Sequence, residues 1–151
     1  APKVKRIKTD ELKKLIQKLS RQINSCEYCC TCGYLFTEMD LKKGICHGGH
    51  FMPGKKTSTQ YYILNIHPQC AKCNIFNEGE QAKYFMFMEK TYGREFTEWL
   101  IKVSDSKYKF TTAELKALWD YCVLALKENH TKEQVTEFFH KTDWYNWAVK
   151  I

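Results

Sequence analysis

The sequence predicts an α+β fold, in which a zinc-stapled ββα core is packed within a mainly helical single domain. The length of 151 residues suits one domain that buries an ordinary hydrophobic core. Apolar residues recur at helical spacing up to residue 23 and again beyond residue 79, but cysteine, glycine and histidine replace this pattern between them. Two Cys-x-x-Cys pairs lie in this middle part, and their spacing is typical of a structural zinc site.

The first element that the sequence predicts is an amphipathic helix. Thr9 or Asp10 can cap its start, and the apolar positions that follow have helical spacing: Leu12, Leu15, Ile16, Leu19 and Ile23. The opposite face is basic and carries Lys13, Lys14, Lys18 and Arg21. Such a face is either solvated or contacts the phosphates of a nucleic acid.

Short β-favouring runs follow in the cysteine-rich part. We expect one strand over residues 44–52, a turn-rich loop over residues 53–59 and a second strand over residues 60–66. Pro68 should end the second strand, and a helix should begin at Cys70 and run to Phe76. The order strand, loop, strand, helix makes residues 26–80 the candidate ββα core.

The remainder, residues 81–151, has the pattern of a helical part. We expect helices over residues 81–91, stopped by Gly93, and over residues 95–103, 112–127 and 131–140, the last of which can continue to the end of the chain. Cys122 lies within an apolar run and is most simply a buried small hydrophobic residue. The apolar C-terminal sequence WYNWAVKI is a candidate surface for a homodimer.

Cysteine spacing favours a structural zinc site over disulfides, because thiols stay reduced inside a cell. The predicted ligands are two pairs of thiolates: Cys29, Cys32, Cys70 and Cys73. Cys26 with Cys29 has the same spacing. The pair Cys29 and Cys32 is favoured because Gly33 follows it, and glycine commonly follows a zinc knuckle. In a rival arrangement, Cys46 and the adjacent His47 complete the ligand set.

Histidine and asparagine recur in a recognisable order between and beside the cysteine pairs. The sequence GHF spans residues 49–51, NIHPQCAKCN spans residues 65–74, and EG and YG follow downstream. This arrangement resembles the HNH, or His-Me finger, endonucleases, and most closely the NinG and Rap recombination nucleases of lambdoid phages. The resemblance covers residues 26–96.

The resemblance implies roles for three residues in the hydrolysis of phosphodiester bonds in DNA. His50, neutral at about pH 7, would be the general base that takes the proton of the attacking water. Asn65 would bond the imidazole or the backbone of His50 and so fix the ring. Asn74 would bind a catalytic Mg²⁺ or Mn²⁺ through its amide oxygen, separately from the structural Zn²⁺.

One position departs from the usual HNH pattern. Many of these nucleases carry a second metal ligand, an aspartate or histidine, directly before the base, but this chain has Gly49 there. His47, His67 or Asp40 can replace that ligand, or the scissile phosphate and water complete the shell of the ion. Because of this glycine, a second interpretation stays open: the chain is a purely structural relative of these nucleases that has no activity, and His50 is only hydrogen-bonded.

The charge of the chain fits a nucleic-acid partner. Lysine and arginine total 24 against 17 acidic residues, which gives a net charge of +7 and an isoelectric point near 8.9. Lys55 and Lys56, beside the expected site, would grip phosphates together with the basic face of the first helix. The resemblance implies branched recombination intermediates, such as Holliday junctions or D-loops, as the DNA substrate.

Two further functions stay open beside the endonuclease. The first is a non-catalytic zinc-stabilised module that binds nucleic acid, in which Asn65 and His67 only satisfy turns. The second is a zinc-stabilised protein-interaction domain. No apolar stretch reaches the length of a membrane span and no signal peptide is recognisable, so we expect a cytoplasmic protein of phage or prophage origin that acts in the host cell.

Overall fold

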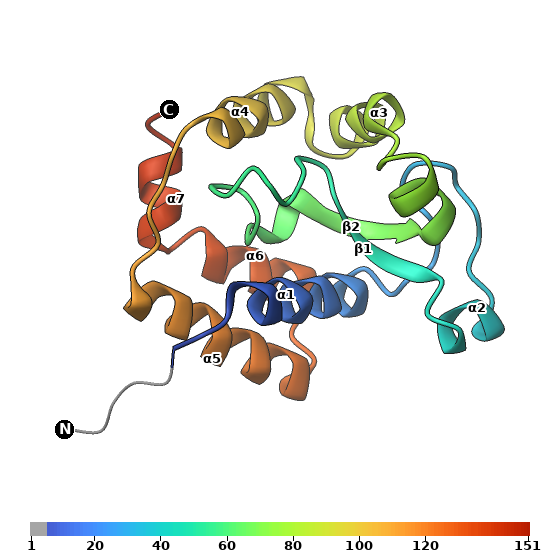
Figure 1. The fold of residues 1–151 in the computed structure, drawn as a ribbon, viewed down its shortest axis with the longest axis horizontal. Helices are drawn as coiled ribbons and strands as arrows, with labels where there is room; N and C mark the ends of the chain where they lie inside the picture. The colour runs from blue at the N-terminus through green and yellow to red at the C-terminus, as the bar shows by residue number, and fades with distance from the viewer. Residues whose placement is uncertain (1–5) are drawn as a thin grey trace.

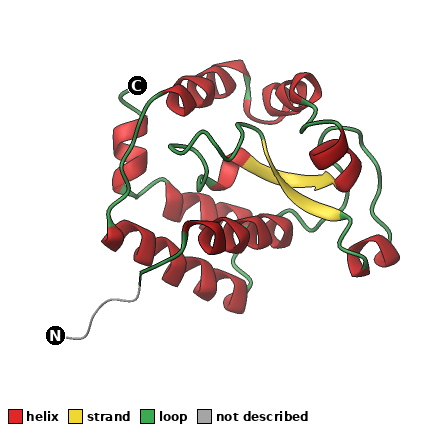
Figure 2. Ribbon diagram, viewed as in Figure 1, coloured by secondary structure: helices red, strands yellow, loops and turns green. Residues whose placement is uncertain are grey.

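The computed structural model describes residues 6–151, in which helices surround a two-stranded sheet (Figure 1). The first half contains α1 (Thr9–Ile23), α2 (Glu38–Lys42), β1 (Cys46–His50), a 3₁₀ turn (Ile63–Asn65), β2 (Ile66–Cys70) and a π-helical turn (Lys72–Phe76). The helices of the second half are α3 (Gln81–Tyr92), α4 (Arg94–Asp105), α5 (Thr112–Glu128), α6 (Lys132–Phe139) and α7 (Asp143–Ala148). This mixed, mostly helical composition agrees with the predicted α+β class (Figure 2). No helix in the described part is long and apolar enough to cross a membrane.

α1 lies against one face of the sheet and buries the hydrophobic stripe that its sequence predicts. Its fully buried apolar residues are Leu12, Ile16 and Leu19. Two polar side chains fasten it to the strands: Gln17 Nε2 donates to Gly48 O at 2.9 Å, and Ser20 Oγ donates to Ile66 O at 2.6 Å. A Cβ at Gly48 would lie 2.8 Å from the Cβ of Gln17, so this close approach of helix and strand requires glycine.

β1 and β2 pair in antiparallel fashion, with Cys46 opposite Cys70 and His50 opposite Ile66. The second strand therefore begins where the predicted strand over residues 60–66 was expected to end. Residues 60–65 form turns instead, and every one of them is buried. Their β-favouring side chains serve as anchors in the core, which is the physical reason why the prediction for this strand was wrong.

Pro68 lies inside β2, although it was expected to end the strand. Phe51 N donates to Asn65 O at 2.7 Å, and the alternation of the antiparallel ladder then places Pro68 and its partner Gly48 at a non-hydrogen-bonded pair. The missing N–H of proline thus costs no bond to β1. Its carbonyl oxygen, in contrast, accepts from Cys30 N at 2.9 Å, which ties β2 to the first cysteine segment.

The helix expected over residues 70–76 is present as the π-helical turn Lys72–Phe76. α2 was not expected, because five residues are too few to show an apolar period. It is defined by a capping box, in which Asp40 N donates to Thr37 Oγ1 and Thr37 N donates to the Asp40 carboxylate.

The four helices predicted after residue 80 are confirmed by α3 to α6, whose ends differ from the prediction by no more than two residues. A capping box between Thr111 and Glu114 starts α5. The chain does not continue α6 to its end. α7 begins separately behind Thr142, whose Oγ1 accepts from Tyr145 N at 3.2 Å.

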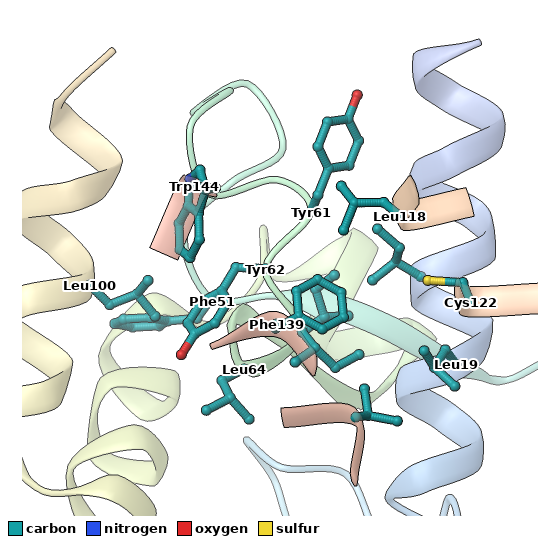
Figure 3. Packing of buried hydrophobic residues seen from close by; sticks show 14 of the residues in the cluster. Leu19, Phe51, Tyr61, Tyr62, Leu64, Leu100, Leu118, Cys122, Phe139 and Trp144 are labelled. Atoms are coloured by element: carbon teal, nitrogen blue, oxygen red, sulfur yellow. The ribbon is translucent and has the colours of Figure 1, made fainter. Parts of the chain in front are cut away.

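The hydrophobic core joins the turns before β2 to the C-terminal helices (Figure 3). The ring of Tyr62 packs against Trp144 with centroids 4.8 Å apart, and Trp144 Nε1 donates to Ser58 O at 2.6 Å. α1 contributes Leu19 to the same cluster. Cys122 is fully buried there, as its apolar surroundings in the sequence predicted.

The C-terminal segment WYNWAVKI, predicted as a surface for a homodimer, packs largely within the chain. Trp144 and Ala148 are buried, and the Trp147 ring lies 4.9 Å from that of Tyr108. The exposed large apolar residues of the segment are Val149 and Ile151. Tyr145 and Trp147 are partly exposed, and a homodimer through this segment stays a prediction.

Candidate functional site

Four sulfur atoms lie within 4.8 Å of one another, and they belong to the two pairs that the spacing predicts: Cys29, Cys32, Cys70 and Cys73. The Sγ atoms of Cys32 and Cys70 are 3.8 Å apart. A tetrahedral zinc ion with Zn–S bonds of about 2.3 Å requires sulfur atoms about 3.8 Å apart. The cluster could therefore hold a structural metal ion such as zinc.

Two segments bring these thiols together. Cys29 lies in a tight turn, where its N–H donates to Tyr34 O at 2.8 Å, and Cys73 lies in the π-helical turn after β2. Burial opposes ionisation of Cys29, but hydrogen bonds to Thr31 and to backbone groups outweigh it and lower the pKa of its thiol to about 6. Burial raises the pKa of Cys73 to about 12. A bound cation is what would let all four thiols ionise together.

The rival arrangement with Cys46 and His47 as zinc ligands is not formed. Cys46 donates its thiol hydrogen to the Sγ of Cys26 at 2.9 Å. Both sulfurs lie outside the four-sulfur cluster, and the ring of His47 contacts Asn74 instead. The alternative in which Cys26 and Cys29 form the zinc-binding pair is therefore also not formed.

His50 ends β1, and its ring is partly exposed. Nε2 donates to Gln60 O at 2.9 Å, which fixes the neutral ring with its proton on Nε2. Nδ1 is left as an acceptor and has no hydrogen-bond partner within residues 6–151. Burial lowers the pKa of His50; the Gln60 carbonyl opposes this shift, and Lys13 adds to it. The imidazole is thus held in its neutral form at neutral pH.

The Asn65 side chain forms no hydrogen bond to His50, in contrast to the expectation. It is fully buried, accepts from Met52 N at 2.8 Å, and donates to Met52 O at 3.0 Å and to Thr59 O at 3.1 Å. These three bonds close the loop between the strands. Thr59 precedes Gln60, so Asn65 positions the residue whose carbonyl holds His50, rather than the ring itself.

His67 faces the core and has no nitrogen left for an ion, contrary to its expected role as a ligand. Its Nδ1 donates to the Tyr84 hydroxyl oxygen at 3.1 Å, and its Nε2 accepts from the Tyr92 hydroxyl at 2.7 Å. Burial lowers the pKa of His67 to about 3. Asp40, another candidate, is engaged in the cap of α2 through Thr37.

His47 and Asn74 are brought together by β1 and the π-helical turn. Asn74 Nδ2 donates to His47 Nδ1 at 3.0 Å. Half a turn of the amide exchanges its nitrogen and oxygen, so the pair can present Oδ1 and Nδ1 to one divalent ion. The two residues border an open pocket together with Lys18 and Arg21 of α1. His50 is not among the residues that line this pocket.

The space that a side chain at Gly49 would fill is taken by Gln69. A Cβ at Gly49 would lie 2.9 Å from the Cβ of Gln69 and 3.0 Å from its Cδ, with Oε1 closer still. Gln69 Nε2 donates to Thr31 Oγ1 at 3.1 Å and to Gly79 O at 2.8 Å, whereas its buried Oε1 has no hydrogen-bond partner.

Two residues of the candidate site, Gln69 and Gln60, were not predicted from the sequence. Gln69 was missed because a single glutamine in a strand matches no motif. Gly49, which lies diagonally opposite Gln69 on the paired strand, is the signal that could have pointed to it. Gln60 acts through its backbone carbonyl, which every residue has, so the sequence carries no signal for it.

The basic residues of α1 follow β1 along the sheet. Lys13 lies near His50 at one end of the strand, and Lys18 and Arg21 border the pocket at the other end. Lys14 is exposed on the same helix. The predicted basic face thus flanks the strand that carries His47 and His50.

The two loop lysines differ from each other. Lys55 is exposed, as a role in binding phosphate requires. Lys56 is paired with Asp105 of α4, with Nζ and the carboxylate oxygen 2.7 Å apart. The pair is exposed to solvent, so its hold on Lys56 is weak, and the role of Lys56 in gripping phosphates stays a prediction.

The fold and the cysteine cluster define a small, mostly helical α+β protein with a candidate structural zinc site. A family model described as NinG, Bacteriophage Lambda NinG protein, matches residues 1–133. The chain therefore belongs to the NinG family, as its motifs implied. No similar curated protein and no similar solved structure was found.

Proposed function

We propose that the protein is a metal-dependent endonuclease that hydrolyses phosphodiester bonds in DNA, with His50 as the general base. The observation that carries the proposal is the hydrogen bond from His50 Nε2 to Gln60 O, which leaves Nδ1 unprotonated at the end of β1. A general base needs this state near neutral pH, and the lowered pKa of His50 favours it. Branched recombination intermediates are the proposed substrate because of the resemblance to the NinG and Rap nucleases.

The proposed catalytic ion, Mg²⁺ or Mn²⁺, is assigned to Asn74 and His47. Their side chains are adjacent and offer one amide oxygen and one imidazole nitrogen, a donor set that suits Mn²⁺ and, with water, Mg²⁺. When bound, the ion supplies positive charge beside the phosphate and the departing oxygen. His67 has no part in this assignment, because its ring is bonded within the core.

The proposed phosphate position follows from the geometry of β1. His47 and His50 are three residues apart on β1 and therefore face opposite sides of the sheet, so a phosphate that meets both His50 and the ion would lie across the edge of the strand. β1 ends at His50, and Lys13 lies beside it. The exposed Lys14 and the pocket residues Lys18 and Arg21 would hold neighbouring phosphates without sequence preference.

The proposed zinc ion has a structural duty. Asn74 directly follows Cys73, and Cys70 ends the strand that pairs with β1. A metal ion at the four sulfurs would thus hold the turn that carries Asn74 against the strand that carries His47.

A cleavage assay on linear, flapped and four-way DNA with Mg²⁺ or Mn²⁺ tests the proposal. We expect His50→Ala to lower the cleavage rate roughly 10²- to 10⁴-fold with unchanged zinc content. Asn74→Ala should raise the Mn²⁺ concentration needed for cutting. His130→Ala is the matched control, because His130 bonds Glu128 and Tyr121 on the helical side. Undiminished cutting by His50→Ala would refute the assigned base.

A second candidate, the non-catalytic zinc module that binds nucleic acid, is favoured by one observation: His50 does not line the pocket of His47 and Asn74. It predicts zinc binding and DNA binding without cutting in the same assay. A protein-interaction domain predicts DNA binding that disappears at moderate salt.

A further inference from the structure

We propose that Gln69 Oε1 is an oxygen ligand of the catalytic divalent ion and takes the place of the side chain that Gly49 lacks. This inference rests on the proposed function, because it concerns the ion assigned there. Gln69 lies on β2, on the sheet face that also carries His47 and Gly49.

The first observation is the position of the oxygen. In aspartate the carboxylate oxygens lie about 2.4 Å from the Cβ, by standard bond lengths and angles. Oε1 of Gln69 lies closer than this to the place that a Cβ of Gly49 would take, and the Cβ and Cδ of Gln69 follow at 2.9 and 3.0 Å. An oxygen donor is therefore present at residue 49 without a side chain at that position.

The second observation is that this oxygen has no partner. Gln69 is fully buried, and both hydrogens of its amide nitrogen are used by Thr31 Oγ1 and Gly79 O. These bonds fix the orientation of the amide and leave Oε1 without a donor within residues 6–151. A buried acceptor without a donor is rare in native proteins, and an ion or water is the ordinary explanation.

The third observation concerns the neighbours. His47 pairs directly with Gln69 across the sheet, and Asn74 bonds His47. His47, Gly48 and Asn74 line an open pocket, and Gln69, the cross-strand partner of His47, is buried beside them. An ion held by Gln69 would also lie beside residue 49, the residue that directly precedes the base in the sequence, whereas His47 is three residues away along β1.

Metal binding tests this proposal without relying on DNA cutting. In the wild-type protein, the side-chain carbonyl carbon signal of Gln69 should shift when Mg²⁺ is added, together with signals of His47 and Asn74. Gln134 is the matched control, since it is a glutamine in the capping box of α6 and does not line the pocket of His47 and Asn74. Shifts at His47 and Asn74 with none at Gln69 would overturn the proposal, as would no Mg²⁺-dependent shift at any of them.

Variants give the second readout, the Mn²⁺ affinity measured by calorimetry and electron paramagnetic resonance. Gln69→Leu should weaken Mn²⁺ binding by roughly tenfold or more, and Gln69→Glu should retain or strengthen it because it keeps an oxygen. Gln134→Leu, on α6, should not change it. If Gln69→Leu and the wild type bind Mn²⁺ with equal affinity, Gln69 is not a ligand of the ion, even if the protein cuts DNA. Mn²⁺ binding through Gln69 without DNA cutting would instead refute the endonuclease alone.

Discussion

The phenol of Tyr84 joins His67 to the strand that ends in the proposed base. Its hydroxyl donates to Gly49 O at 2.7 Å and accepts from His67 Nδ1 at 3.1 Å. Because the single hydroxyl hydrogen is used at Gly49, the imidazole must carry its proton on Nδ1 and accept from Tyr92 at Nε2. His67 is thus a neutral, fully bonded part of the core.

This arrangement predicts loss of stability in acid. The pKa of His67 is about 3 in the folded protein and about 6.5 in an unfolded chain, so the unfolded state binds a proton that the folded state does not. Stability should fall as the pH falls below about 6.5, by about 1.4 kcal/mol per pH unit from this group. Urea unfolding of zinc-saturated protein at several pH values measures it. His67→Gln should show a shallower pH dependence; an equal slope in both proteins would contradict the assignment.

Metal removal should act on the region around the four sulfurs. We expect one zinc per chain by elemental analysis, lost on replacing Cys29, Cys32, Cys70 or Cys73 by serine. Cys26→Ser is the matched control, since its thiol contacts Cys46 outside the cluster and should leave the zinc content unchanged. Zinc retained in full by Cys73→Ser would exclude that thiol as a ligand.

The pH dependence of cleavage follows from His50. A base must be unprotonated, and the pKa of His50 is lowered, mainly by burial. The acidic limb of kcat/KM should therefore have its midpoint below the ordinary histidine value of about 6.5. Lys13→Ala removes a nearby positive charge and should move that midpoint upward. A midpoint above 6.5 in wild type would show that another group titrates.

The basic residues that border the pocket should control DNA affinity rather than chemistry. Lys18→Ala and Arg21→Ala should each weaken binding to all DNA sequences alike, and each should reduce the slope of log affinity against log salt by about 1. Lys116→Ala is the control, because Lys116 is paired with Asp120 on α5 at 2.7 Å. Salt titrations of DNA binding measure all three, and an equal slope for Arg21→Ala and wild type would remove Arg21 from the interface.

The packing of α1 on β1 can be tested at a single position. Gly48→Ala places a Cβ 2.8 Å from the Cβ of Gln17 and 3.0 Å from its backbone, so it should destabilise the protein by about 1–3 kcal/mol. Gly54→Ala is the matched control, since the nearest atom there is the flexible Lys13 Nζ at 3.7 Å. Thermal or urea unfolding of both variants gives the comparison, and equal stabilities would mean that α1 and β1 can separate at little cost.

The sequence was sufficient for α1, for α3 to α6 and for the four sulfurs, because a helical period and a Cys-x-x-Cys spacing are local patterns. It was misleading for the second strand, since burial of residues 60–65 depends on the distant C-terminal helices. The roles of His67 and Asn65 were likewise beyond prediction. Tyr84 and the backbone of Met52 determine their bonds, and neither contact leaves a trace in a linear motif.

The bond from Trp144 to Ser58 also constrains the order of folding. The two residues are 86 positions apart, and Ser58 belongs to the segment whose Gln60 carbonyl holds His50. A chain emerging from the ribosome can form α1 and the cysteine turns early, but this segment gains its support when α7 is released. We therefore expect the segment that holds His50 to lack this support in a nascent chain until Trp144 has left the ribosome.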